Sequence, residues 1–283
     1  MRDFSGKGAF VTGGASGIGL ALGRAFAGLG MKVMLADIDR DALEQAVRQL
    51  GETGAELRGV LCDVSDRTAV QRAAQAAFNA FGKVHVVCNN AGVSAGGPME
   101  EVPPADWDWV IGVNLMGVIY GIEAFVPHMK AHGEGSHIVN TGSMAGMVSP
   151  PGMGPYNACK HAVVTLSETL AAELAGSNIG VSVLCPGWVN TRINQSGRNR
   201  PARFGPPRET PAAARERAAE IAELLRTGMD PTEVAARVVA AVRDNDLHIF
   251  THPAMRPALD DRFRRILAAY DKAAAFKKEG ERP

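Results

Sequence analysis

Short apolar runs, each about the length of one strand, recur along the chain. They lie near residues 9–12, 32–36, 58–62, 84–88, 137–141, 181–185 and 247–250. Between most of these runs the apolar positions repeat with the period of a helix, over residues 17–29, 40–50, 67–81, 106–131, 157–175 and 232–243. Strands and helices that alternate at this spacing predict an α/β fold, with a parallel sheet of about seven strands and helices on both faces.

One segment, residues 192–230, breaks this alternation. It begins with the arginine- and proline-rich stretch Arg198–Arg208 and continues with an Ala/Glu/Arg-rich stretch, Thr210–Thr227, that predicts a helix. Because the segment starts soon after a strand end, we expect it to form a helical lid over a ligand site. The alternative is a solvated surface insertion with no role in function.

The residues after Pro257 have an amphipathic pattern, whose apolar positions are Leu259, Phe263, Ile266, Leu267 and Tyr270. We therefore predict a helical tail over residues 259–283 that packs on the domain or on a neighbouring subunit. Residues 1–258, with the segment 192–230 included, are expected to form a single domain.

Composition narrows the possible classes of protein. The 283 residues carry 30 basic and 30 acidic side chains, so no excess of positive charge points to nucleic acid. The first residues lack the apolar core of a signal peptide, and no run approaches the ~18 apolar residues of a membrane span. The four cysteines are widely separated and the seven histidines show no metal-ligand spacing, which favours a metal-free protein of the reducing cytoplasm.

The first apolar run ends in a glycine-rich turn, Thr12–Gly19, and a helical stretch follows it. Gly13, Gly17 and Gly19 allow the backbone to approach a pyrophosphate closely, and the start of the helix offers free N–H groups to it. The second strand ends at Asp37, 18 residues beyond Gly19, where a carboxylate can accept hydrogen bonds from ribose hydroxyls. This arrangement predicts a Rossmann-like, doubly wound sheet that binds a dinucleotide.

A tyrosine and a lysine stand four residues apart, at Tyr156 and Lys160, so both lie on one face of the predicted helix. A cation beside a phenol favours the phenolate and lowers the pKa of the tyrosine from about 10. We therefore expect Tyr156 to exchange a proton with an alcohol or a ketone near neutral pH.

Seven motifs in order along the chain resemble those of the short-chain dehydrogenase/reductase family, and the resemblance covers nearly the full length. They are Thr12–Gly19, Cys62–Val64, Asn89–Gly92, Asn114, Thr141–Ser143, Tyr156 with Lys160, and Pro186 through Thr191. A less specific resemblance, to the Cα-dehydrogenases of lignin-dimer catabolism and to bacterial dehydrogenases of bulky or aryl secondary alcohols, rests on Trp107–Gly121, Asp230–Ala236 and His248–Pro253.

The family resemblance implies a catalytic set of four residues. Ser143 places the substrate oxygen and stabilises the charge that develops on it, and Tyr156 is the acid–base. Lys160 lowers the pKa of the tyrosine and holds the nicotinamide ribose. Asn114 connects Lys160 to solvent through its backbone carbonyl and a water, although a polar residue within a helix needs no such role.

The same resemblance implies a dinucleotide site made of Gly13, Ser16, Gly17, Ile18, Gly19, Asp37, Asp63, Val64, Asn90, Gly92, Tyr156, Lys160, Pro186, Gly187, Val189 and Thr191. Residues 63–64 are expected at the adenine ring, although an acid at this point also suits a turn. Asp37 favours NAD because it would repel a 2′-phosphate, and Ser16 and Ile38 stand where NADP-dependent relatives carry a basic residue. Arg40 keeps NADP open as an alternative.

Apolar side chains border the expected substrate position beside Ser143 and Tyr156. They are Met144, Met153, Trp188 and Phe204. Methionines provide an adaptable apolar wall and aromatic rings provide flat packing surface. The hypothesis is a bulky, mostly uncharged and aryl-substituted alcohol or ketone under the 192–230 lid. Some methionines could instead pack beneath the loop, and the arginines of the lid could engage a carboxylate or a phosphate.

We therefore expect an NAD-dependent secondary-alcohol dehydrogenase. One alternative is an NADPH-dependent carbonyl or β-ketoacyl reductase, which Asp37 disfavours. Another is a cofactor-sensing protein without catalysis, which the intact catalytic set disfavours. The helical stretches 106–131 and 157–175 carry apolar residues on more than one face, so we expect a homodimer or a homotetramer.

Overall fold

The computed structural model describes residues 1–52, 54–207 and 215–276. The chain divides into two units, Met1–Thr251 and His252–Pro283. The division expected after residue 258 thus falls inside the second unit.

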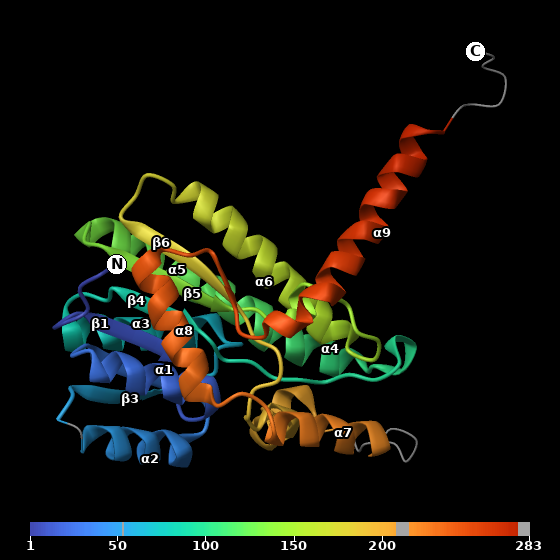
Figure 1. Cartoon of the computed structure of the whole chain (residues 1–283). Coiled ribbons are helices and arrows are strands. Elements are labelled where there is room, and N and C mark those ends of the chain that lie inside the picture. The colour runs from blue at the N-terminus through green and yellow to red at the C-terminus, as the bar shows by residue number, and fades with distance from the viewer. Residues whose placement is uncertain (53, 208–214, 277–283) are drawn as a thin grey trace. The chain divides into compact units, whose positions relative to one another are not determined.

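The first unit is built around a parallel sheet, which has seven strands in the described part of the chain (Figure 1). The strands are β1 Gly8–Thr12, β2 Lys32–Asp37, β3 Leu57–Leu61, β4 Val86–Asn89, β5 Ser136–Thr141, β6 Ile179–Cys185 and β7 His248–Phe250. Their spatial order is β3-β2-β1-β4-β5-β6-β7, so the direction of chain progress reverses between β1 and β4. Ligands of doubly wound sheets bind at the carboxyl ends of the strands beside such a reversal. The predicted fold class is confirmed.

The central strands are apolar because helices cover both faces of the sheet. Every residue of β1 and β5 is buried, whereas β3, at the edge, exposes Arg58, Gly59 and Leu61. One face packs against α1 Gly17–Gly28, α2 Arg40–Gly51 and α8 Pro231–Asp244. The other face packs against α3 Arg67–Phe81, α4 Pro104–Ile111, α5 Gly117–His132 and α6 Gly154–Glu173.

Aspartates begin three of these helices. Asp39 before α2, Asp66 before α3 and Asp230 before α8 each accept a hydrogen bond from a backbone N–H in the first turn. Helix α8 ends at Asn245, whose φ of 60° lies in the left-handed region that stops a helix. These caps explain why the helices begin close to the predicted positions.

The helix predicted over residues 106–131 is a continuous Pro104–His132 helix with an inserted π turn, Gly112–Met116, between α4 and α5. By length and composition it could cross a membrane, since its most apolar window has a mean hydropathy of 1.7. Our search of the sequence for an unbroken apolar run did not find this helix, because polar residues interrupt it. Half of the window is buried inside the fold, and the ring of Phe125 packs 4.7 Å from that of Phe10 on β1, centroid to centroid. We therefore interpret it as a core helix.

The 192–230 segment contains the short 3₁₀ helices η4 Ile193–Asn199 and η5 Ala202–Phe204, followed by α7 Arg215–Arg226. The helix predicted over Thr210–Thr227 begins at Arg215 among the described residues, and residues 208–214 lie outside them. Helix α7 buries Leu225, while Arg217 and Arg226 pair with Glu220 and Glu223 on its own surface. The arginine-bearing face of α7 is therefore consistent with the alternative of a solvated surface helix.

The second unit contains η7 Pro253–Met255 and α9 Arg256–Ala274. The predicted apolar stripe of the tail lies on α9, and its side chains are exposed at Phe263, Ile266, Leu267 and Tyr270. What covers this stripe stays a prediction.

Candidate active site

The glycine-rich turn between β1 and α1 adopts a conformation that requires glycine. Gly13 and Gly17 have positive φ angles of 63° and 53°. A Cβ atom on Gly19 would lie 2.1 Å from the carbonyl oxygen of Gly13. Ser16 precedes α1 without a side-chain cap, so the first N–H groups of the helix remain available to bind a phosphate.

Thr12 braces this turn against the end of β4, a role that our sequence analysis missed. Its Oγ1 accepts hydrogen bonds from the N–H groups of Asn90 (2.9 Å) and Ala91 (3.0 Å). The Asn90 side chain in turn donates to the carbonyl of Thr12 over 3.0 Å. The position of Thr12, directly before Gly13, was the available signal. These bonds tie the end of β1 to the end of β4.

Asp37 lies at the end of β2, where the ribose of a dinucleotide was predicted. The side chain is 9% exposed. Its Oδ2 accepts from the N–H of Ala15 in the glycine turn, and its Oδ1 accepts from the N–H of Asp39, both at 3.0 Å. Two backbone donors thus orient the carboxylate beside the turn while each oxygen keeps a lone pair for a further donor.

Ser143, Tyr156 and Lys160 meet where β5 ends and α6 begins. Lys160 is 2% exposed, and its Nζ donates to the carbonyl of Thr141 over 2.8 Å. The same Nζ lies 5.4 Å from the centre of the Tyr156 ring. Ser143 hydrogen-bonds with the Tyr156 side chain, and its Oγ also accepts from the N–H of Ala145. The structure therefore brings the three predicted side chains together.

The expected lowering of the tyrosine pKa is not observed in this structure. Burial raises the pKa of Tyr156 to about 12, and the hydrogen bond with Ser143 offsets only part of that rise. Burial also lowers the pKa of Lys160 to about 8. The physical reason is that both groups are desolvated, and desolvation disfavours the charged form of each. The sequence showed the neighbouring cation but not how deeply the pair is buried.

Asn114 lies in the π turn and is fully buried. Its Oδ1 accepts from the N–H of Val93 and its Nδ2 donates to the carbonyl of Val93, both at 2.8 Å. Gly92 lies close to both side chains: a Cβ built on it would be 3.4 Å from Asn114 Oδ1 and 3.7 Å from Lys160 Nζ. The side chain thus clamps the segment after β4 beside Lys160. π turns recur at functional sites in helices.

The segment after β6 closes the other side of the cleft. The carbonyl of Pro186 accepts from the N–H of Met144 over 2.9 Å, which ties the ends of β6 and β5 together. Val189 is buried. The methyl of Thr191 lies 3.0 Å from the Cβ position of Gly17, so this segment reaches the glycine turn.

The predicted substrate residues do not all lie on one side. Met144 is buried, while Met153 and Trp188 are half-buried and retain some exposed surface. The ring of Phe204 lies 3.7 Å from the Cβ position of Gly112, which also faces Ser65. Phe204 therefore lies beside the π turn and the segment that follows β3.

Asp63 and Val64 lie directly after β3. Asp63 Oδ1 accepts from the backbone N–H of Ser65 (3.0 Å) and from its hydroxyl (2.6 Å), which is the predicted turn. Val64 is buried and packs against Gly117 of α5, whose Cβ position is 2.9 Å from Val64 Cγ2. The other oxygen of Asp63 remains at the surface of the cleft, where it accepts from Arg203.

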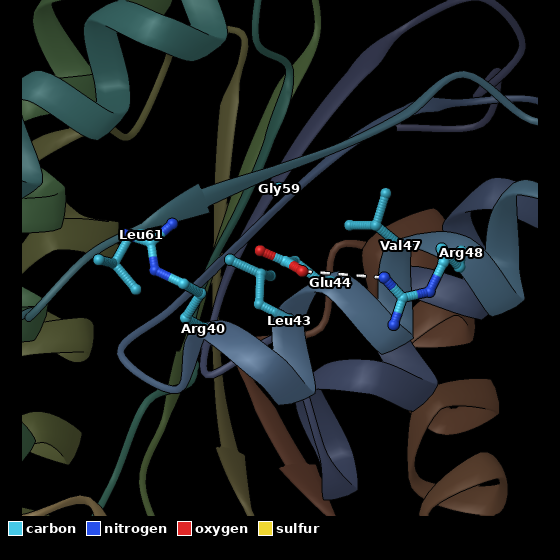
Figure 2. Close-up of a pocket in the computed structure, with 7 residues that line it drawn as sticks. All are labelled: Arg40, Leu43, Glu44, Val47, Arg48, Gly59 and Leu61. Carbon is cyan, nitrogen blue, oxygen red and sulfur yellow. Dashed lines mark ion pairs between the residues drawn. The ribbon is translucent and has the colours of Figure 1, made fainter.

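A hollow lies on the outside of the fold, between α2 and the edge strand β3 (Figure 2). It has a volume of about 450 Å³ and is lined by Arg40, Leu43, Glu44, Val47, Arg48, Gly59 and Leu61. None of the catalytic side chains lines it, and Glu44 is paired with Arg48 over 3.8 Å. The described residues contain no group of three metal-ligating side chains. This hollow is therefore separate from the residues that gather at the carboxyl ends of the strands.

Known proteins share this fold. The family model "short chain dehydrogenase" matches residues 7–202. The chain is 36% identical over 282 residues to the "C alpha-dehydrogenase" of Sphingobium sp., with 99% of this chain and 91% of that protein covered. It is 34% identical over 272 residues to the "CLA biosynthesis dehydrogenase/reductase" of Lactiplantibacillus plantarum, with 94% and 95% covered. A crystal structure of a short chain dehydrogenase/reductase from Burkholderia phymatum in complex with NAD superposes with a TM-score of 0.92 at 44% identity, covering 95% of this chain and 97% of that one.

Proposed function

This chain belongs to the short-chain dehydrogenase/reductase family, and from that premise we propose an NAD-dependent enzyme that interconverts a bulky, aryl-substituted secondary alcohol and its ketone. The observation that carries the proposal is the meeting of Ser143, Tyr156 and Lys160 in one buried cluster. This cluster lies at the carboxyl ends of the central strands, which also end at the glycine turn and at Asp37.

The residues of the cleft fit NAD. The glycine turn packs too closely on neighbouring backbone for a Cβ at Gly13 or Gly19. The start of α1 carries no side-chain cap, which suits a pyrophosphate. The buried Asp37 carboxylate suits two ribose hydroxyls and would repel a 2′-phosphate. The related Burkholderia phymatum enzyme was crystallised with NAD, which supports the same choice here.

NAD supplies the hydride chemistry when it is bound, and the side chains of the protein handle the proton. With a pKa of about 12, Tyr156 is protonated near neutral pH and can donate its proton to a ketone oxygen. Ser143 is placed to donate a hydrogen bond to the same oxygen and to stabilise charge on it. Lys160, with a pKa of about 8, can pass a proton onward near the working pH. In the oxidative direction the pKa of Tyr156 must fall when the cleft is filled, and Lys160 would assist that fall.

A bulky aryl substrate is supported by the walls beside Ser143 and by one relative. Met153 and Trp188 combine burial with some exposed surface, and such side chains form adaptable, flat apolar walls. The Sphingobium relative is named a C alpha-dehydrogenase. Met147 packs instead on the apolar cluster beneath the loop, so one methionine of the loop serves the core.

NADP is the second candidate cofactor, and one observation favours it. Burial lowers the pKa of Arg198, and the Asp39 and Asp37 carboxylates lie near enough to offset part of that shift. A guanidinium that senses Asp37 would attract a 2′-phosphate. Because two backbone donors fix Asp37 beside the glycine turn, we place NAD first.

The test is a turnover assay with both cofactors, followed by the absorbance of the reduced nicotinamide. Substrates run from 2-propanol and small hydroxy acids to 1-arylalkanols, and a Ser143→Ala protein prepared in the same way gives the background rate. The proposal expects the highest kcat/KM with NAD and a 1-arylalkanol. Highest activity on small or anionic alcohols would exclude the apolar pocket, and preference for NADP would exclude the cofactor assignment.

We further propose a homodimer or homotetramer in the cytoplasm. Leu115 and Ile122, on the continuous Pro104–His132 helix, and Leu166, on α6, are only partly buried, and a partner subunit would cover them. All four cysteines are free and buried, which suits a reducing compartment.

A further inference from the structure

Residues 198–204, here called the strap, are tied firmly to α4. The guanidinium of Arg200 pairs with Asp106 over 2.5 Å, and their side chains are 3% and 6% exposed. The same guanidinium lies 4.8 Å from the ring of Trp109, and it donates two hydrogen bonds to the carbonyl of Phe204. A buried, fully partnered ion pair of this kind favours a single geometry over many. The strap is therefore an ordered part of the fold.

The anchored strap extends one arginine to the end of β3. Nη2 of Arg203 donates to Oδ2 of Asp63 over 2.6 Å and to the hydroxyl of Ser65 over 2.7 Å. The Arg203 guanidinium also lies 4.7 Å from the ring of Phe204. Asp63 is 18% exposed in this pair. Arg203 thus holds one carboxylate oxygen of Asp63 in a fixed direction, while Ser65 holds the other.

The order of the strands shows which part of a dinucleotide this corner would face. The glycine turn follows β1 and Asp37 follows β2, and β3 is the next strand outward. A ligand whose pyrophosphate lies at β1 and whose ribose lies at β2 must place its base beyond β2, above the end of β3. The catalytic side chains follow β5, on the other side of β1. The strap therefore covers the adenine end of the cleft and not the substrate end.

We propose that Arg203 is a specificity-determining positioning residue of the dinucleotide site. It aims the Asp63 carboxylate at the amino group of adenine, while its guanidinium packs on the ring of Phe204. This inference rests on the proposed use of NAD. It also reassigns the front of the 192–230 lid from the substrate to the cofactor.

The test uses calorimetric titration of the full chain with NAD, ADP and IDP. ADP and IDP share the ribose and diphosphate, but IDP carries an oxygen where adenine carries its amino group. Variants are Arg203→Ala, Arg203→Lys, Asp63→Asn and the double variant Arg203→Ala/Asp63→Asn. Arg226→Ala is the control, because Arg226 pairs with Glu223 on its own helix. Thermal unfolding checks that each variant is folded.

We expect Arg203→Ala to weaken ADP binding by about three- to tenfold, the range between an exposed ion pair and a charge-assisted hydrogen bond. The ADP-to-IDP affinity ratio should fall toward that of Asp63→Asn, with Arg203→Lys intermediate. The double variant should be no worse than Asp63→Asn, since Arg203 acts through Asp63.

Two results would overturn the inference while leaving the cofactor assignment intact. One is normal ADP affinity in Arg203→Ala, and the other is an equal loss for ADP and IDP that adds to the loss in Asp63→Asn. If the unmodified protein binds neither NAD nor ADP, both the cofactor assignment and the strap inference are wrong.

Discussion

Asn114 offers a quantitative test of how the site is held together. Its fully buried side chain makes two 2.8 Å hydrogen bonds to the backbone of Val93, one to the N–H and one to the carbonyl. Asn114→Ala removes both hydrogen bonds, so the N–H and the carbonyl of Val93 both lose their partner. An unsatisfied buried polar group costs about 1–3 kcal/mol, so the free energy of unfolding should fall by about 2–5 kcal/mol.

Urea denaturation followed by tryptophan fluorescence measures this change. The matched control is Asn178→Ala, because Asn178 also donates to a backbone carbonyl, that of Gly133 over 3.0 Å, but at an exposed position. Water can replace that bond, so the control should lose less than about 1 kcal/mol. If Asn114→Ala loses no more than the control, the clamp on Val93 does not stabilise the fold and the reasoning is refuted.

Three further predictions concern cofactor choice, acid stability and assembly. Asp37→Ser should shift the ratio of NADP to NAD affinity toward NADP by about 1–3 kcal/mol, because it removes the charge that repels a 2′-phosphate; an unchanged ratio in titrations of both cofactors would contradict this. Burial lowers the pKa of His137 to about 3, below its unfolded value of about 6.5. The stability that this neutral group contributes is therefore complete above about pH 6.5 and is lost as the pH falls toward 3, at up to ~1.4 kcal/mol per pH unit. Urea denaturation across this range should show the decline, and His137→Asn should flatten it. Light scattering should give a multiple of the 29.8 kDa chain mass, whereas a monomer mass would count against the proposed assembly.

Features that depend on local backbone chemistry could be predicted from the sequence. The positive φ angles of Gly13 and Gly17 explain why glycine stands at both positions. The carboxylate of Asp37 lies at a strand end because the apolar run stops there. Tyr156 and Lys160 share a helix face by their spacing alone. In each case the determining interaction is close in sequence.

The π turn could not be predicted in this way. Residues Gly112–Met116 have the composition of an ordinary apolar helix. The contact that accompanies the turn joins Asn114 to Val93, 21 residues earlier. Periodicity describes only neighbours along a helix, so an insertion fixed by a distant backbone segment leaves no signal in it.

Phe204 shows the same limit at the ligand site. Its position depends on the buried pair between Arg200 and Asp106, which are 94 residues apart. An arginine-rich segment predicts a solvated surface unless a buried acid is known to meet it. The pKa of Tyr156 is a similar case, because the depth of burial, and not the neighbouring lysine, has the larger effect.

The most direct test of the central claim, that Tyr156 is the acid–base, is Tyr156→Phe. The change keeps the ring and removes the hydroxyl, so kcat for ketone reduction should fall by at least ~10²–10⁴-fold. The Kd for NAD, measured by calorimetry on the same preparation, should stay close to that of the unmodified protein because the glycine turn and Asp37 are untouched. A Tyr156→Phe enzyme that retains near-full kcat would contradict the mechanism.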